Sequence, residues 1–120
     1  MKVYLAGPMR GYPEFNFPAF HAAAAKLRDE GHEVFSPAER DIERHEGVDI
    51  SKGNMTGDEK IAIAEHGFNL REALGEDLAW ICKEAEAVAL LPGWEFSRGA
   101  CAEHATAQAL DLKIIKLERE

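Results

Sequence analysis

The sequence predicts an α/β protein built on an open, doubly wound parallel sheet of about four strands, flavodoxin-like or Rossmann-like, in the order 2-1-3-4. Short apolar runs of strand length recur along the chain, and helix-like periodicity fills most of the intervals between them. Glycine or proline ends each of the first three runs. Strands and helices that alternate in this way form right-handed crossovers and leave helices on both faces of the sheet. The runs are Lys2–Ala6, Glu33–Ser36, Ala87–Leu91 and Lys113–Leu117.

A helix is predicted between the first two strands. The first run ends at Gly7-Pro8, and Asn16 is placed to cap the helix that follows. Pro18 suits the first helical turn, where its missing N–H is not needed. The helix runs to about Glu30, and Gly31 is its C-terminal stop. Its inner face consists of Phe20, Ala23, Ala24 and Leu27.

The segment from Ala38 to about Phe68 has the weakest pattern. It is polar and dotted with glycine, and it lacks sustained periodicity. We expect a long loop or lid at about 40–68, with one helical turn near Asp58 to Glu65. Loops of this length are usually functional lids or disordered, and the sequence leaves that choice open.

A further helix begins after Asn69, which is placed as its cap, and runs to about Ala85. Asp77 falls inside its apolar arc. A carboxylate drawn toward a core needs a partner or a purpose, because burying it alone is costly. The alternative is that Asp77 lies at the rim and pairs with Arg71. The apolar arc consists of Leu70, Leu74, Leu78, Ile81 and Ala85.

The stretch from Ala87 to Glu103 is the most informative part of the chain. Its buried strand stops at Pro92-Gly93, and Ser97 offers a side-chain oxygen to cap a helix that runs to about Leu110. Glu103 stands one turn beyond Gly99, so its carboxylate leans over a residue without a side chain. This presentation is typical of a nucleophile or a ligand anchor. The alternative is an ordinary solvated glutamate.

The strand order places two loops at one crevice. In an open parallel sheet, ligands bind at the carboxyl ends of the strands where the order reverses. Here that point lies between the first and third strands. We therefore expect the loop Gly7 to Gly11 and the segment Pro92 to Glu103 to line the site from opposite sides.

Composition narrows the class of partner. The chain of 120 residues suits a single domain, 1–120. Its net charge of -8 opposes binding to a nucleic-acid polymer, whose affinity comes mostly from Lys and Arg on phosphates. Arg10 and Arg98 still provide local positive charge for a small anion.

No apolar run approaches the roughly 20 residues of a membrane span, and MKVYLAG turns polar too soon for a signal peptide. We expect a cytoplasmic protein, with Cys82 and Cys101 as reduced core thiols.

The sequence lacks the motifs of several common kinds of functional site. The first loop reads GPMRG, so the dinucleotide fingerprint and the P-loop are both absent. There is no G-x-S-x-G nucleophile elbow. The cluster Glu43, His45 and Asp49 lacks recognised ligand spacing, and His104 points about 100° away from Glu103 on a helix. We expect no metal and no cofactor.

Three stretches together resemble the nucleoside 2-deoxyribosyltransferase superfamily. They are YLAGPMRG at Tyr4 to Gly11, Asp77 in the helix before the third strand, and SRGACAE at Ser97 to Glu103. The closest likeness is to small uncharacterised phage and bacterial proteins that share the LLPGWE-x-S-x-G-A stretch. The resemblance implies a small-molecule nucleoside or nucleotide as partner, no cofactor, and a homo-oligomer.

The resemblance also implies residue roles. Glu103 matches the nucleophilic glutamate, Tyr4 the tyrosine that hydrogen-bonds it, and Asp77 the aspartate that donates a proton or orients the substrate. Ser97 is similar to the deoxynucleoside-monophosphate N-hydrolase branch, where a serine helps to bind the 5′-phosphate. Pro8 and Cys101 depart from the pattern, since the hydrolases have a small hydroxyl residue at the first position and both branches favour glycine at the second. The implied substrate-binding residues are Gly7, Pro8, Met9, Arg10, Gly11, Gly93, Trp94, Ser97 and Gly99.

The expected function is cleavage or transfer at the N-glycosidic bond of 2′-deoxynucleosides or their monophosphates. A covalent glycosyl-glutamate would form and then be resolved with retention of configuration. Hydrolysis of 2′-deoxynucleoside 5′-monophosphates is one alternative. Non-catalytic binding of a nucleotide or sugar phosphate is another. A third is an interaction protein that uses the 40–68 segment as its contact surface.

Overall fold

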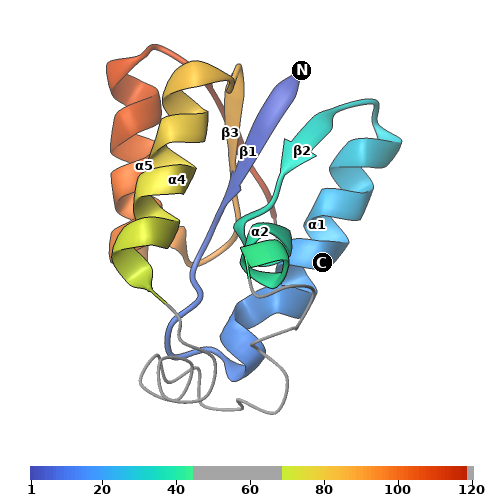
Figure 1. Ribbon diagram of the computed structural model, residues 1–120. Coiled ribbons are helices and arrows are strands. Elements are labelled where there is room, and N and C mark those ends of the chain that lie inside the picture. Colours follow the sequence, from blue (N-terminus) through green and yellow to red (C-terminus); the bar gives the residue numbers. More distant parts are fainter. Residues whose placement is uncertain (45–68, 119–120) are drawn as a thin grey trace.

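The computed structural model describes residues 1–44 and 69–118. Within them, a four-stranded parallel sheet has the order β2-β1-β3-β4, which confirms the predicted class and strand order (Figure 1). The strands match the predicted runs, apart from one residue at the end of each of the last three. They are β1 (Lys2–Ala6), β2 (Glu33–Phe35), β3 (Ala87–Leu90) and β4 (Lys113–Lys116).

Helices cover both faces of the sheet. Figure 1 shows α4 (Leu70–Lys83) and α5 (Arg98–Ala109) side by side, with α1 (Phe17–Asp29) across the sheet from them. Successive side chains of β1 therefore enter two different cores. Val3 and Leu5 pack in the cluster that includes α1, whereas Tyr4 and Ala6 pack in the cluster that includes α4 and α5. The period of the strand thus directs Tyr4 toward α5.

The loop between β1 and α1 differs from the prediction. Asn16 stands at the N-cap position of α1, but its φ of 62° is left-handed and its side chain makes no capping bond. Its Nδ2 instead donates to the carbonyl oxygen of Pro8, at 3.0 Å. The predicted cap is therefore wrong, because Asn16 fastens the short helix η1 (Pro13–Asn16) to the turn after β1.

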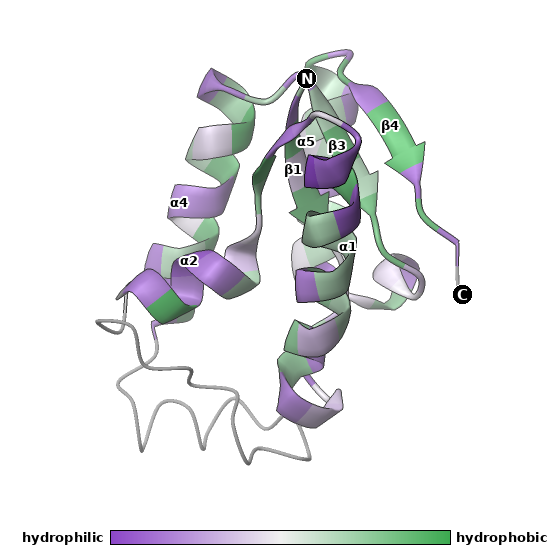
Figure 2. Cartoon of the chain, turned by 90° about the vertical axis from the view of Figure 1, so that its right-hand side faces the viewer, coloured by the Kyte–Doolittle hydropathy of each residue, from purple (hydrophilic) through white to green (hydrophobic). Residues whose placement is uncertain are grey.

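Helix α2 (Pro37–Arg44) occupies the start of the segment that the sequence predicts as a loop. Pro37 suits a first helical position, and the Arg40 N–H donates to the Ser36 carbonyl at 3.0 Å. Ala38 is fully buried and Ile42 packs beside it, so the helix has an apolar side. Figure 2 shows how hydrophilic the rest of α2 is. The predicted turn at 58–65 and the remainder of the lid lie outside the described residues.

Ion pairs attach α2 to its neighbours. Arg28 of α1 makes two hydrogen bonds of 2.6 Å to the Glu39 carboxylate, and the Arg40 Nε donates to Glu76 of α4. These contacts bring α2 to the edge of the sheet, between α1 and α4. The sequence pattern did not reveal this arrangement, because the apolar side of α2 is only a few residues wide.

Both cysteines depart from the prediction of core thiols. Cys82 is exposed and Cys101 is partly exposed, and both are free. Cys82 follows Ile81, the buried residue of its turn, and so faces outward. The Cys101 Sγ donates to the Glu95 carbonyl, at 3.4 Å. Among the helices of residues 1–44 and 69–118, none is long and apolar enough to cross a membrane.

Candidate active site

Helix α5 begins where the sequence places its cap. Gly93 turns the chain with a φ of 88°, and Ser97 then adopts extended backbone angles. The Ser97 hydroxyl accepts a hydrogen bond from the Ala100 N–H, at 3.2 Å. This bond fixes the start of α5, and therefore which of its residues face the sheet. The predicted N-cap is confirmed.

Glu103 lies on the buried side of α5, directly against β1. Its side chain is 6% exposed, and Tyr4 is fully buried. The Tyr4 hydroxyl donates to Glu103 Oε2 at 2.6 Å. A short hydrogen bond from a neutral hydroxyl to a buried carboxylate both orients that carboxylate and stabilises its charge. The side chain is therefore neither solvated nor free to rotate.

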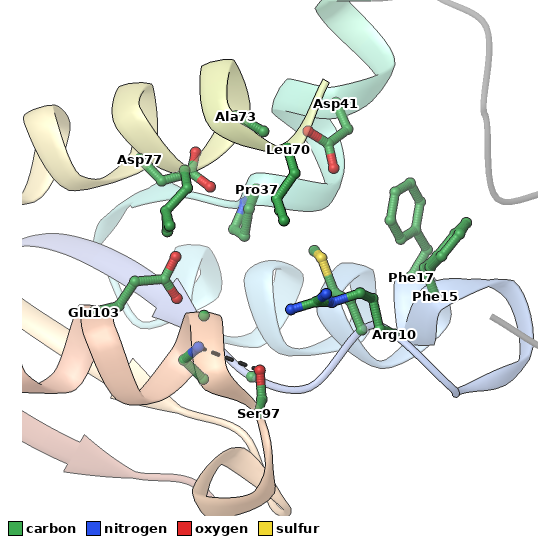
Figure 3. Close-up of a pocket in the computed structure, with 15 residues that line it drawn as sticks. Arg10, Phe15, Phe17, Pro37, Asp41, Leu70, Ala73, Asp77, Ser97 and Glu103 are labelled. Atoms are coloured by element: carbon green, nitrogen blue, oxygen red, sulfur yellow. Dashed lines mark hydrogen bonds between the residues drawn. The ribbon is translucent and has the colours of Figure 1, made fainter. Parts of the chain in front are cut away.

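Asp77 brings a second carboxyl group to the same place from α4. It is 6% exposed and lies on one helix face with Ala73 and Ile81, which are also buried. Figure 3 shows Asp77 above Glu103, with both side chains at the same side of the pocket. Burial thus agrees with the first of the two sequence interpretations, and the rim position is wrong.

Burial and nearby charges shift the pKa values of Glu103 and of its hydrogen-bond partner Tyr4. The pKa of Glu103 is raised to about 8, mainly because burial disfavours its charged form, with further contributions from the charges of Asp77 and Asp41. The hydrogen bond from Tyr4 acts in the opposite direction. Burial raises the pKa of Tyr4 well above its usual range, and Glu103 and Asp77 add to this. Glu103 can therefore gain or lose a proton near neutral pH.

One pocket joins these groups, at the carboxyl ends of β1 and β3 (Figure 3). Glu103 and Asp77 line it together with most of the predicted substrate-binding residues. Gly99 leaves open space, because a Cβ added there would meet no atom within 4 Å. Tyr4 lies behind Glu103 and does not line the pocket. The predicted residues that do line it are Gly7, Met9, Arg10, Asp77, Ser97, Gly99 and Glu103.

Four predicted binding residues lie elsewhere. Pro8 borders a neighbouring groove, and Gly93 lies against the Tyr12 hydroxyl. The Trp94 ring packs against His104, with ring centroids 4.5 Å apart. Gly11 adopts a φ of 83° and does not line the pocket. Their sequence positions are near the pocket, but the turns on which they lie direct them away from it.

The pocket also contains residues that the sequence reasoning missed. The most notable is Asp41 of α2, a third carboxyl group, which is 5% exposed. Its spacing from Ala38 and Ile42 on one helix face is the signal that could have found it. The other missed lining residues are Phe15, Phe17, Pro37, Leu70, Ala73, Leu74 and Ala100.

The expectation that this protein binds no metal stays a prediction. Within 1–44 and 69–118, no group of three or more His, Cys, Asp or Glu side chains is arranged to hold a metal ion. Of the acidic and histidine cluster considered above, Glu43 pairs with Arg40 at 3.2 Å, while His45 and Asp49 lie outside the described residues.

Comparison with known proteins identifies the family but not the activity. Residues 1–116 match the model of a family described as a domain of unknown function (DUF4406). No curated protein and no solved structure matches the chain. The matched range includes both strands at the pocket and every residue that lines it. The chain therefore belongs to the DUF4406 family.

Proposed function

We propose that this protein cleaves or transfers the N-glycosidic bond of 2′-deoxynucleosides or their monophosphates, with Glu103 as nucleophile. The observation that carries the proposal is the buried 2.6 Å hydrogen bond from the Tyr4 hydroxyl to Glu103 Oε2, in a pocket shared with Asp77. An oriented carboxylate beside open space suits attack on an anomeric carbon. The resemblance of these three residues to the nucleoside 2-deoxyribosyltransferases supports the same assignment.

The first chemical step forms a glycosyl-enzyme. A Glu103 oxygen bonds to C1′ of the deoxyribose while the bond from C1′ to the base nitrogen breaks, and that electron pair leaves with the base. A proton from Asp77 neutralises the departing base. Tyr4 holds the unreacted Glu103 oxygen and limits rotation of the carboxylate during attack.

The second step releases the sugar. A water molecule attacks C1′ from the face that the base left, Asp77 takes the proton of this water, and the bond to Glu103 breaks. The deoxyribose then carries the original anomeric configuration, because two inversions have occurred. A second nucleobase in place of water gives a new nucleoside. Exclusion of water from the pocket decides between these outcomes.

Recognition of a 5′-phosphate is supported by the start of α5. Helix α5 has 12 residues, and its first turn presents N–H groups beside Ser97 at the pocket wall. Arg10 lines the same pocket and supplies positive charge. These groups favour the hydrolysis of 2′-deoxynucleoside 5′-monophosphates as the second candidate function.

The test is release of free base from a panel of deoxynucleosides and their 5′-monophosphates, measured by chromatography with and without an acceptor base. We expect release that disappears in Glu103→Gln and survives in Glu95→Gln, a matched change at an exposed glutamate in η2, before the start of α5. Release that is equal in wild type and Glu103→Gln, or absent throughout, contradicts the catalytic assignment. Thermal stabilisation by a ligand without product would instead support a non-catalytic binding protein.

A further inference from the structure

Among the described residues that line the pocket, Asp41 is the carboxyl group to which the proposed chemistry gives no task. It lies on α2, an element that contributes none of the groups assigned to the sugar or the phosphate. Although it is 5% exposed, it lines the pocket, and its charge contributes to the raised pKa of Glu103. It therefore lies within electrostatic range of the reacting centre without belonging to it.

The pocket has two chemically different sides. Figure 3 shows Glu103 and Asp77 at one side and the rings of Phe15 and Phe17 at the other, with Asp41 and Arg10 toward the phenylalanine side. Both rings belong to buried residues. A sugar whose C1′ reaches Glu103 directs its base away from that carboxylate, because the nucleophile attacks opposite the leaving group, so the base passes Asp77 and extends toward the flat apolar rings. A planar heterocycle that enters this side of the pocket meets the residues that line it there, and Asp41 is one of them.

We propose that Asp41 selects the leaving base by accepting hydrogen bonds from it, and that guanine is the preferred base. The proposal rests on the function proposed above. An ionised carboxylate only accepts hydrogen bonds, through two oxygens side by side. Guanine presents two adjacent donors on one edge, N1–H and the N2 amino group, which match both oxygens. Cytosine and adenine offer a single amino group to such a carboxylate.

Thymine is the base that this carboxylate disfavours. Its N3–H lies between two carbonyl oxygens, so a carboxylate placed to accept from N3–H also meets a carbonyl oxygen, which repels it. Good two-point contacts of this kind distinguish bases by about 10- to 100-fold. We therefore expect kcat/KM for deoxyguanosine or its 5′-monophosphate to exceed that for the thymidine counterpart by this factor.

The decisive variant is Asp41→Asn, which keeps the shape of the side chain. Its amide presents one donor and one acceptor, a pattern that fits the O4 and N3–H of thymine. We expect the guanine-to-thymine ratio of kcat/KM to fall by about 10-fold or more, with turnover of the thymidine substrate rising in absolute terms. Glu43→Gln is the matched control, since it removes a negative charge from the exposed side of the same helix and should leave the ratio unchanged.

Three outcomes overturn the inference: equal use of guanine and thymine substrates by wild type, an equal loss for all bases in Asp41→Asn, or the same change in Glu43→Gln. If wild type releases no base at all, the proposed function fails and binding decides the inference separately. Calorimetric titration with deoxyguanosine and thymidine 5′-monophosphates then supports Asp41 as the base-selecting residue if guanine-selective binding is lost in Asp41→Asn. Equal binding, or no binding of either nucleotide, rejects it.

Discussion

At the scale of single residues, the unusual feature is a glutamate whose surroundings favour its neutral form. Glu103 is buried beside Asp77, with Asp41 across the pocket, and the Tyr4 hydroxyl opposes the effect of burial and of both charges by stabilising the Glu103 carboxylate. Nucleophilic attack requires the carboxylate. The Tyr4 hydrogen bond is therefore what lets this residue ionise near neutral pH, and pH becomes a direct probe of the site.

Removing the hydroxyl of Tyr4 should raise the pKa of Glu103. In Tyr4→Phe the pKa of Glu103 rises above its value of about 8, because the bond that lowers it is gone. We expect the rising limb of the kcat/KM profile of wild type to have its midpoint near pH 8, and the rising limb of Tyr4→Phe to lie at higher pH with a lower maximum. Base release measured from pH 5 to 10 checks this. Identical midpoints in the two proteins would contradict the assignment of Glu103 as nucleophile.

The same acidity predicts how stability depends on pH. The pKa of Glu103 is about 8 when folded and near 4.5 when unfolded, so the folded state retains a proton that the unfolded state loses. The contribution to stability is fully present below about pH 4.5 and is lost as pH rises to about 8. Over this pH window, we expect the free energy of unfolding of wild type to fall by about a few kcal/mol relative to that of Glu103→Gln. This magnitude follows from the difference between the folded and unfolded pKa values of Glu103.

Urea denaturation of both proteins from pH 4.5 to 9 measures this difference. Gln does not titrate, and groups distant from residue 103 are shared, so their effects cancel in the comparison. The difference that remains belongs to Glu103 and the carboxyl groups coupled to it, Asp77 and Asp41. Parallel curves for wild type and Glu103→Gln would show that Glu103 keeps an ordinary acidity in the folded protein.

At the scale of elements, the start of α5 combines two tasks. The Ser97 hydroxyl caps the helix and lines the pocket at the same time. The start of α5 depends on local sequence only, since the strand end, the glycine turn and the cap follow one another along the chain. The position of α2, in contrast, depends on ion pairs with α1 and α4. The first element was predictable and the second was not.

Substitutions at Ser97 separate its two tasks. Ser97→Ala should lower the free energy of unfolding by about 1 kcal/mol, because the Ala100 N–H loses its acceptor. Ser97→Asp retains a cap and should keep wild-type stability. Its negative charge, however, should repel a 5′-phosphate, so we expect it to process deoxynucleosides and not their monophosphates.

Thermal denaturation and base release from matched nucleoside and nucleotide pairs measure both effects. Full activity of Ser97→Asp on monophosphates would place the phosphate elsewhere. A stability of Ser97→Asp as low as that of Ser97→Ala would show that the cap is not the source of the effect.

At the scale of the whole molecule, the described surface suggests where a second copy packs. Phe96 is 90% exposed on the turn η2 (Trp94–Phe96), directly before Ser97, and it borders a groove with Pro8 and Arg98. A single exposed phenylalanine is common on protein surfaces, so what makes Phe96 the candidate contact is its place directly before Ser97, which lines the pocket. The expected homo-oligomer would cover it and place another subunit close to the pocket.

We therefore expect wild type to sediment as a dimer or higher oligomer, and Phe96→Ser to shift the equilibrium toward monomer without lowering the stability of the fold. Sedimentation velocity over a range of concentrations measures the shift, and circular dichroism checks the fold. Phe96→Leu is the control, since it keeps an apolar side chain. A monomeric wild type, or an unchanged oligomer in Phe96→Ser, removes this surface from consideration.

The sequence by itself determined the sheet order, the cap at Ser97, and the placement of Glu103 one turn beyond Gly99. The cap and the helical spacing depend on neighbours in the chain, so turn residues and periodicity are enough to specify them. The sheet order joins strands distant in the chain, and it was predictable because alternating strands and helices allow few parallel-sheet topologies. Only the tertiary structure decided that Asp77 is buried, that Asp41 joins the pocket, and that Trp94 and Gly93 face away from it. Those outcomes depend on how α2, α4 and α5 pack against β1. The acidity of Glu103 follows from the same packing, because desolvation and the charges of Asp77 and Asp41 come from residues distant in the chain.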